Sequence, residues 1–175
     1  MDAAHFVLAP FLGYLWCFAR CFVRGPAGRQ RFNVLAALHA VTHELVAVTN
    51  DTYINAQSVC ELLRKIAVLN LGVPITLVLD NARYQKCRLV QDLAEQLGIE
   101  LLFLPSYSPN LNLIERLWKF VKKRVLYSKY YPDFASFSTA IGDCIAEAPS
   151  KHKNELDSLL TLRFQTFTKP QLLGA

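Results

Sequence analysis

The chain has 175 residues, of which 53% are hydrophobic and 19% charged, so its length predicts one domain with a full hydrophobic core. It contains only 7 Gly and 8 Pro residues and has no repeats or polar tracts, which excludes collagen-like, solenoid and disordered proteins. The net charge of +5 favours a polyanionic partner such as nucleic acid, although a solvated helix face would explain the charge equally well.

The longest apolar stretch, residues 6–19, is too short for a membrane span and is interrupted by Pro10 and Gly13. No basic leader precedes it, so it does not have the pattern of a signal peptide. We therefore expect a cytoplasmic protein with no membrane contact. The five cysteines include no CxxC pair and are expected to be reduced core residues.

The first half of the chain has the pattern of antiparallel strands followed by a helix. Strand-like runs are expected at residues 13–19, 32–41 and 44–49. The apolar residues change to helical spacing over residues 56–71, and Gly72 with Pro74 should end that helix.

The second half has the pattern of a parallel crossover unit followed by more helices. Residues 75–79 and 99–104 are apolar runs expected as strands buried on both faces, with a helix over residues 85–97 between them. Further helices are expected after the Pro-rich loop 105–110, over residues 114–125, 134–146 and 156–162. Together these elements predict an α/β fold, a mixed five-stranded sheet with helices on both faces.

Two carboxylates stand at the ends of expected strands. Asp80 directly follows residues 75–79, at the strand end where ligand sites of open α/β sheets gather, although Asp-Asn is also an ordinary turn opener and helix cap. Asp2 precedes the first strand-like run. If the two strands are neighbours, the carboxylates would lie close together, and like charges at short range repel unless they bind a cation.

A third carboxylate, Glu115, lies in the first turns of its helix, where an acid also simply stabilises the helix dipole. Trp118, Lys119 and Lys122 share its side of that helix. Carboxylates hold hard divalent cations and lysines hold phosphates, so this arrangement suits a metal-dependent phosphodiester site. Three such carboxylates could supply oxygen ligands for two Mg²⁺ ions.

Other catalytic motifs are missing from the sequence. There is no GxxxxGK[ST], GxGxxG or HExxH pattern, which argues against P-loop NTPases, dinucleotide enzymes and zincins. Ser106 and Ser108 lack the context of a nucleophile elbow. His5 is expected on the strand face opposite Asp2 and is interpreted as a structural histidine.

Two segments, LVLDNARYQKC (residues 77–87) and LPSYSPNLNLIERLWKFVKKRVL (residues 104–126), resemble the catalytic core of mariner-like DDE transposases, specifically their bacterial insertion-sequence branch. The 34 residues between Asp80 and Glu115 fit the spacer of that branch, and the opening DAAHF resembles its first-aspartate strand. By position, the resemblance implies an RNase H-like fold in which Asp2, Asp80 and Glu115 form the catalytic, metal-binding triad. It also implies two Mg²⁺ or Mn²⁺ ions and cleavage of double-stranded DNA at element ends, followed by 3′-hydroxyl attack on target DNA.

The basic residues near the triad are the expected contacts to DNA phosphates. They are Lys119, Lys122, Lys123, Arg124 and Arg83. Asn81 is expected to shape the turn after Asp80 rather than to touch DNA. Self-association into a homo-oligomer is a further expectation to test.

The sequence also departs from the family. Ser106 and Leu113 replace prolines, Asn110 replaces an aspartate, and no helix-turn-helix region precedes Asp2. We therefore expect residues 1–175 to form a single catalytic domain whose first strand is cut short. Two alternatives stay open: an inactive remnant that at most binds DNA or a full-length partner, and a host RNase H-like nuclease acting on RNA–DNA hybrids or junctions.

Overall fold

The computed structural model describes residues 1–8, 16–20, 22, 25, 29–105 and 108–164. The elements within these residues are, in chain order, β1 (Asp2–Val7), β2 (Arg31–Leu38), β3 (Leu45–Asn50), α1 (Ala56–Val68), β4 (Ile75–Leu79), α2 (Arg88–Gln96), β5 (Ile99–Phe103), the 3₁₀ turn η1 (Pro109–Leu111), α3 (Ile114–Val125), α4 (Phe134–Lys151) and α5 (Lys153–Leu159). None of the helices α1 to α5 combines the length and apolar character that crossing a membrane requires.

The five strands have the directions that the sequence predicts, but they form two hydrogen-bonded groups rather than one sheet. Strands β1, β2 and β3 pair antiparallel in that order, and β4 pairs parallel with β5. A hydrogen bond of 2.6 Å from Met1 N to Val78 O links the start of β1 to β4. The start of β1 therefore lies beside the carboxyl end of β4.

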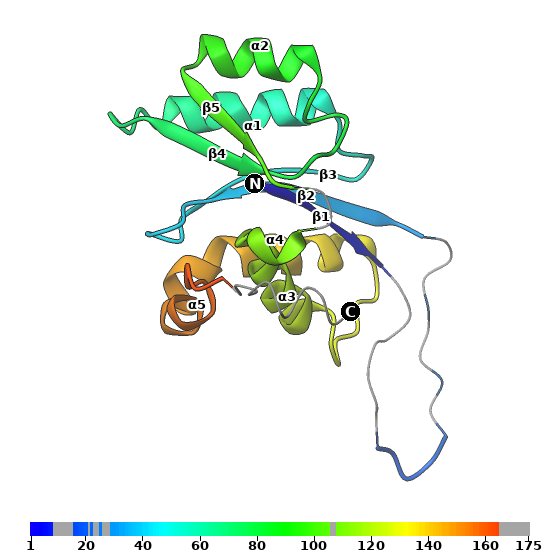
Figure 1. Ribbon diagram of the computed structural model, residues 1–175. Coiled ribbons are helices and arrows are strands. Elements are labelled where there is room, and N and C mark those ends of the chain that lie inside the picture. The colour runs from blue at the N-terminus through cyan, green and yellow to red at the C-terminus, as the bar shows by residue number, and fades with distance from the viewer. Residues whose placement is uncertain (9–15, 21, 23–24, 26–28, 106–107, 165–175) are drawn as a thin grey trace, which may run out of the picture.

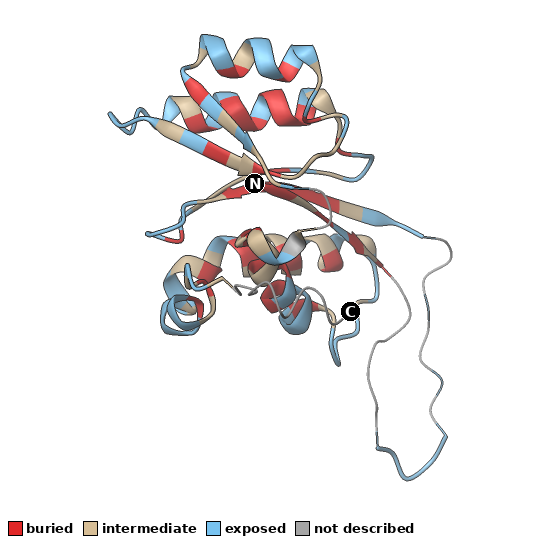
Figure 2. Ribbon diagram, viewed as in Figure 1, coloured by how far each residue is buried: buried red, intermediate tan, exposed pale blue. Residues whose placement is uncertain are grey.

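Helices cover both faces of the β1–β2–β3 sheet, as Figure 1 shows: α1 and α2 lie on one side, and α3, α4 and α5 on the other. The alternating side chains of β2 divide between the two layers. Val34 and Ala36 join the core formed with α3, α4 and α5, whereas Leu35 and Ala37 join the core formed with α1 and α2. In Figure 2 the buried residues accordingly line the sheet and the helix faces turned toward it.

The expected first strand over residues 13–19 was wrong, because the first strand of the structure is β1 at Asp2–Val7. Residues 16–19 are not in a strand, and the side chains of Trp16 and Phe18 are fully exposed; residues 13–15 lie outside the described residues. The strand forms earlier because alternate residues of β1 are buried while its backbone pairs with β2, with Phe6 opposite Phe32.

The strands β4 and β5 are also less buried than the sequence predicts. Thr76, Glu100 and Leu102 are exposed, so the two strands pack against α1 and α2 on one face only. An apolar run such as 75–79 does not by itself distinguish a strand covered on two faces from one covered on a single face. The burial of the other face was therefore overestimated.

Helix α5 lies three residues earlier than the expected range 156–162, and α2 and α4 differ from their expected ranges mainly at one end each. Helix α2 begins at Arg88, since residues 83–87 form turns in which the side chain of Gln85 is completely buried. Helix α4 continues to Lys151 although Pro149 cannot donate a helical N–H bond. Asp133 caps its start by accepting a bond of 2.7 Å from Ser136 N.

Arg116 on α3 holds the segment that follows α5. Its guanidinium donates to the carbonyl oxygens of Leu159 (3.2 Å), Thr161 (2.7 Å) and Arg163 (3.1 Å). Because hydrogen bonds from a charged group each contribute about 1.5–3 kcal/mol, Arg116→Ala should lower the free energy of unfolding by about 2–4 kcal/mol. Urea unfolding measures this change. Arg88→Ala is the matched control, since the Arg88 side chain is 93% exposed and its replacement should change stability by less than about 0.5 kcal/mol.

Candidate active site

Asp2 is held at the first position of β1 by contacts from three other parts of the chain. The preceding residue, Met1, donates its N–H to Val78 O of β4, and its carbonyl oxygen accepts from Asn112 Nδ2 at 3.3 Å. The carboxylate of Asp2 accepts a bond of 3.0 Å from Trp118 Nε1 of α3. Asp2 is only 8% exposed, so β4, the η1–α3 connection and α3 together fix its position.

Burial and neighbouring charges change the acidity of Asp2. Burial is the largest cause that raises its pKa from 3.8 to about 6, and the charges of Glu115 and Asp80 raise the pKa further. The backbone N–H of Ala3 acts in the opposite direction. The structure thus brings three carboxylates from β1, β4 and α3 close enough to interact.

Asp80 follows β4 directly, at the carboxyl end of the strand, and is half-buried. Its neighbour Asn81 donates from Nδ2 to the carbonyl oxygen of Leu104, which ties the residue after β4 to the residue after β5. That bond gives Asn81 a structural role between the two strand ends, and the expectation that Asn81 shapes the turn after Asp80 stays a prediction. Tyr84 lies in the following turn, where burial first, then the charge of Asp80, raises the pKa of its phenol.

Glu115 is the second residue of α3 and is half-buried. The backbone N–H of Glu115 donates to the carbonyl oxygen of Asn112 at 3.1 Å, so the connection that contacts Met1 also begins the helix. The apolar face of α3 includes Leu117 and Trp118, which are buried in the core with β1. Packing of that face against β1 fixes α3, and with it Glu115, relative to Asp2.

No group of three Asp, Glu, His or Cys side chains among the described residues is gathered closely enough to enclose a metal ion. The chemistry of the three acids nevertheless fits a hard divalent cation, because all three offer carboxylate oxygens and repel one another without one. Asp2, Asp80 and Glu115 are thus coupled electrostatically but are not drawn together around one point.

The basic residues expected to contact DNA differ in their surroundings. Lys119, Lys122 and Lys123 are exposed on α3, and Arg83 is exposed in the turn after β4. Arg124 instead forms an ion pair of 2.6 Å with Glu155 and lies 4.7 Å from the ring centroid of Phe120. Its guanidinium therefore also has a structural role that joins α3 to α5.

His5 lies on the opposite face of β1 from Asp2, as the strand alternation predicts. Its side chain is exposed, and its Nδ1 lies 2.6 Å from Oδ1 of Asn33 on β2. The interpretation of His5 as a structural histidine is therefore confirmed. Among the cysteines, Cys60 is buried, but Cys17 is exposed, which the expectation of core thiols did not allow for.

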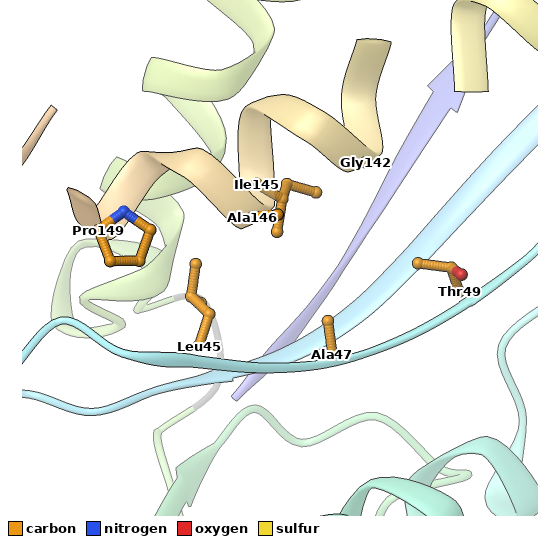
Figure 3. A pocket seen from close by; sticks show the side chains of 7 residues that line it. All are labelled: Leu45, Ala47, Thr49, Gly142, Ile145, Ala146 and Pro149. Carbon is orange, nitrogen blue, oxygen red and sulfur yellow. The ribbon is translucent and has the colours of Figure 1, made fainter. Parts of the chain in front are cut away.

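A cavity of about 280 Å³ lies away from the acids. Figure 3 shows it between β3 and α4, where small side chains leave space. Its lining consists of Leu45, Ala47, Thr49, Gly142, Ile145, Ala146 and Pro149. Because this lining contains no titratable side chain, the cavity is not part of the acidic site.

Sequence comparison places the chain in a family. The model of the DDE superfamily endonuclease family matches residues 1–138. The chain belongs to the DDE superfamily endonucleases. It is also 30% identical, over 95 residues, to a protein of Shigella sonnei described as the insertion element IS630 uncharacterized 39 kDa protein. That alignment covers 54% of this chain and 28% of the other protein, so the chain spans a little over a quarter of the relative's length.

Solved structures share the fold at low sequence identity. The Mos1 transposase paired-end complex with left transposon end has a TM-score of 0.56 at 14% identity, covering 91% of this chain and 55% of the Mos1 chain. The Mos1 transposase catalytic domain solved with raltegravir and Mg gives 0.55 at 15% identity, covering 79% and 78%. The catalytic core of BIV integrase gives 0.54 at 18% identity, covering 73% and 87%. The expected RNase H-like fold is confirmed by these likenesses.

Sequence reasoning missed the contacts that hold the acids in place. Two of these contacts, the bond from Trp118 to Asp2 and the bond from Asn112 to Met1, join residues that are distant in the chain. The third, the proximity of Tyr84 to Asp80, arises in a turn. Only the place of Trp118 on the side of Glu115 gave a signal, because helical spacing relates those two residues.

Proposed function

We propose that residues 1–175 form the catalytic domain of an insertion-sequence transposase that cleaves and joins double-stranded DNA with divalent metal ions. One observation carries this proposal: in a chain of the DDE endonuclease family, the carboxylates of Asp2, Asp80 and Glu115 interact across three elements. The insertion-element relative supports transposition over a host nuclease. For a bacterial insertion sequence, the place of action would be the cytoplasm.

In this proposal Asp2, Asp80 and Glu115 hold two Mg²⁺ or Mn²⁺ ions. Related structures support a divalent ion, since Mos1 transposase has been solved with Mg and with Mn. Ions bound there would supply Lewis-acid chemistry, which lowers the pKa of a water or 3′-hydroxyl and offsets charge on the phosphate. The chain itself contributes carboxylates held on a strand, a strand end and a helix, and Trp118 excludes water from one side of Asp2.

The DNA backbone would lie along the exposed side of α3. Lys119, Lys122 and Lys123 are the proposed phosphate contacts there, with Arg83 at the turn after β4 and Arg124 at the far end of α3. Element ends and target are the proposed DNA partners. A second copy of the chain is also proposed as a partner, supported by the paired-end complex in which the Mos1 relative was solved.

Removing two of these lysines should weaken DNA binding in a salt-dependent way. Each lysine that neutralises a phosphate contributes about one unit to the slope of log K against log salt, so replacing both Lys122 and Lys123 by Ala should flatten the slope by up to about 2 units. Fluorescence anisotropy with a labelled duplex at several salt concentrations measures this. The control replaces Lys151 and Lys153 by Ala, exposed lysines at the α4–α5 junction; an equal loss in that control would place the DNA elsewhere.

A nicking assay tests the proposed function. The folded chain should nick supercoiled plasmid DNA in Mn²⁺ or Mg²⁺ and lose this activity in EDTA, while an RNA–DNA hybrid should be a poorer substrate. Preference for the hybrid would support the host-nuclease alternative. A folded chain that cuts neither substrate at any metal concentration would support the inactive remnant and end the proposal of catalysis.

A further inference from the structure

A buried tryptophan holds one oxygen of the first aspartate. Trp118 is 2% exposed and Asp2 8% exposed, and Nε1 of the indole lies 3.0 Å from Oδ2 of the carboxylate. The two residues are 116 positions apart in the sequence, so local chain geometry does not impose this contact. It forms only because α3 packs against β1.

We propose that Trp118 is a positioning residue, which orients the Asp2 carboxylate for binding a divalent cation; the proposal rests on the proposed function of the acidic site. The indole N–H is a donor only, so it can bind a carboxylate oxygen but can never compete with that oxygen for a cation. It engages Oδ2, which leaves Oδ1 and the remaining lone pair of Oδ2 for other partners. One rotamer of the Asp2 side chain is thereby favoured.

The position of Trp118 on α3 gives this bond a second consequence. Glu115 lies three residues earlier on the same helix, so the two side chains project from one side of α3 one turn apart. The helix that carries one carboxylate of the site therefore also carries the donor that orients another. A displacement of α3 would move Glu115 and release Asp2 together.

The packing around the indole makes it a rigid donor. Trp118 belongs to the core that includes Ala4 and Phe6 of β1 and Leu117 and Val121 of α3. A charge-assisted bond from a fixed donor also reduces the cost of burying a carboxylate beside two others. A tryptophan that served only to fill the core would need no polar partner at Asp2. Core packing uses the apolar ring, whereas orientation of Asp2 uses the indole N–H, so removal of the N–H separates the two roles.

Fluorescence provides a readout of this contact that does not depend on cleavage. The chain has two tryptophans, and the other, Trp16, is fully exposed. In a Trp16→Phe protein, Trp118 is the only indole, and titration with Mn²⁺, a paramagnetic quencher, should quench its emission with saturation. Addition of Mg²⁺ should displace Mn²⁺ from the site and restore the emission. The same protein carrying Asp80→Ala should show no saturable quenching.

Trp118→Phe tests the role itself, since it removes the N–H and keeps an apolar ring. Partners that orient a metal ligand typically affect metal affinity 10- to 100-fold, so calorimetry should show Mn²⁺ binding weakened by about that factor. DNA nicking should return toward the wild-type kcat when Mn²⁺ is raised to saturation. If Trp118→Phe does not fold, substitution of Trp118 by 3-benzothienylalanine, in which sulfur replaces the N–H of the same ring system, should give the same weakened binding.

The outcomes separate this inference from the proposed function. Wild-type Mn²⁺ affinity in a folded protein without the Trp118 N–H, together with lost binding in Asp80→Ala, would overturn the positioning role alone. Mn²⁺ binding that survives Asp80→Ala would overturn the proposed metal site, and the role of Trp118 with it. Weakened binding on removal of the N–H, with cleavage restored by excess Mn²⁺, is the expected result.

Discussion

Asp80→Ala is expected to abolish Mn²⁺ binding and metal-dependent DNA cleavage while leaving the fold intact. The side chain of Asp80 is half-buried at the end of β4 and accepts a weak bond of 3.5 Å from Ala82 N, so removing it should disturb the structure little. The loss of one carboxylate from three coupled acids removes a metal ligand and a charge that balances the cation. Isothermal calorimetry with Mn²⁺ and the plasmid nicking assay measure both effects.

Glu115→Ala is expected to give the same double loss from a different element. Asp143→Ala is the matched control, because Asp143 is an exposed carboxylate on α4 that contributes no coupling to Asp2. Circular dichroism and thermal unfolding establish that each variant is folded. Cleavage at the wild-type rate by either Asp80→Ala or Glu115→Ala would remove that residue from the proposed mechanism.

Asp2→Asn is expected to have opposite effects on stability without and with metal. The pKa of Asp2 is raised from 3.8 to about 6, so the folded metal-free protein holds this proton more tightly than the unfolded chain does. Stability from this group is therefore full below about pH 4 and is lost as the pH rises through about 6. The rise corresponds to about 3 kcal/mol, and Asp2→Asn should raise the free energy of unfolding in EDTA by roughly this amount at pH 7.5 but by little at pH 4.

In Mn²⁺ at about 1,000 times its dissociation constant, wild type should become more stable than Asp2→Asn at pH 7.5. A ligand that binds only the folded state stabilises it by about 4.1 kcal/mol at that concentration, which exceeds the gain from Asp2→Asn, and the variant should lose this stabilisation. Urea unfolding at both pH values, in EDTA and in Mn²⁺, measures the four states, with Asp143→Asn as the control. An Asp2→Asn protein that is less stable than wild type in EDTA at pH 7.5 would contradict the electrostatic account.

The fold could be predicted from the sequence where a pattern was long or clearly ended. The helical spacing over residues 56–71 matches α1, and the run 75–79 matches β4. The short strand β1 was indicated only by the resemblance of DAAHF to the family's first-aspartate strand, because six residues with two alanines and a histidine give little strand signal and the pairing partner β2 begins 24 residues after the end of β1. The expected end of α4 at residue 146 was too early, because a proline such as Pro149 usually indicates the end of a helix, whereas α4 continues past it to Lys151.

The site was predictable in its residue types but not in its packing. Asp80 and Glu115 could be singled out because each occupies a recognisable place, a strand end and a first helical turn. That Asp2 would be buried, and coupled to both, depends on β1 lying beside β4 and α3. No local pattern encodes such neighbours, and for the same reason the donor role of Trp118 could not be read from its position three residues after Glu115.

The long separation between Asp2 and Trp118 also has a consequence for synthesis of the chain on the ribosome. At about 5–20 residues per second, roughly 6 to 23 s pass between the addition of Asp2 and that of Trp118, which lies 116 positions later. During that interval β1 can already pair with β2, but β4 and α3 arrive later, so β1 is at first an open edge strand of the growing sheet. The nascent chain can therefore form the paired strands β1 and β2 well before Asp2, Asp80 and Glu115 can come together.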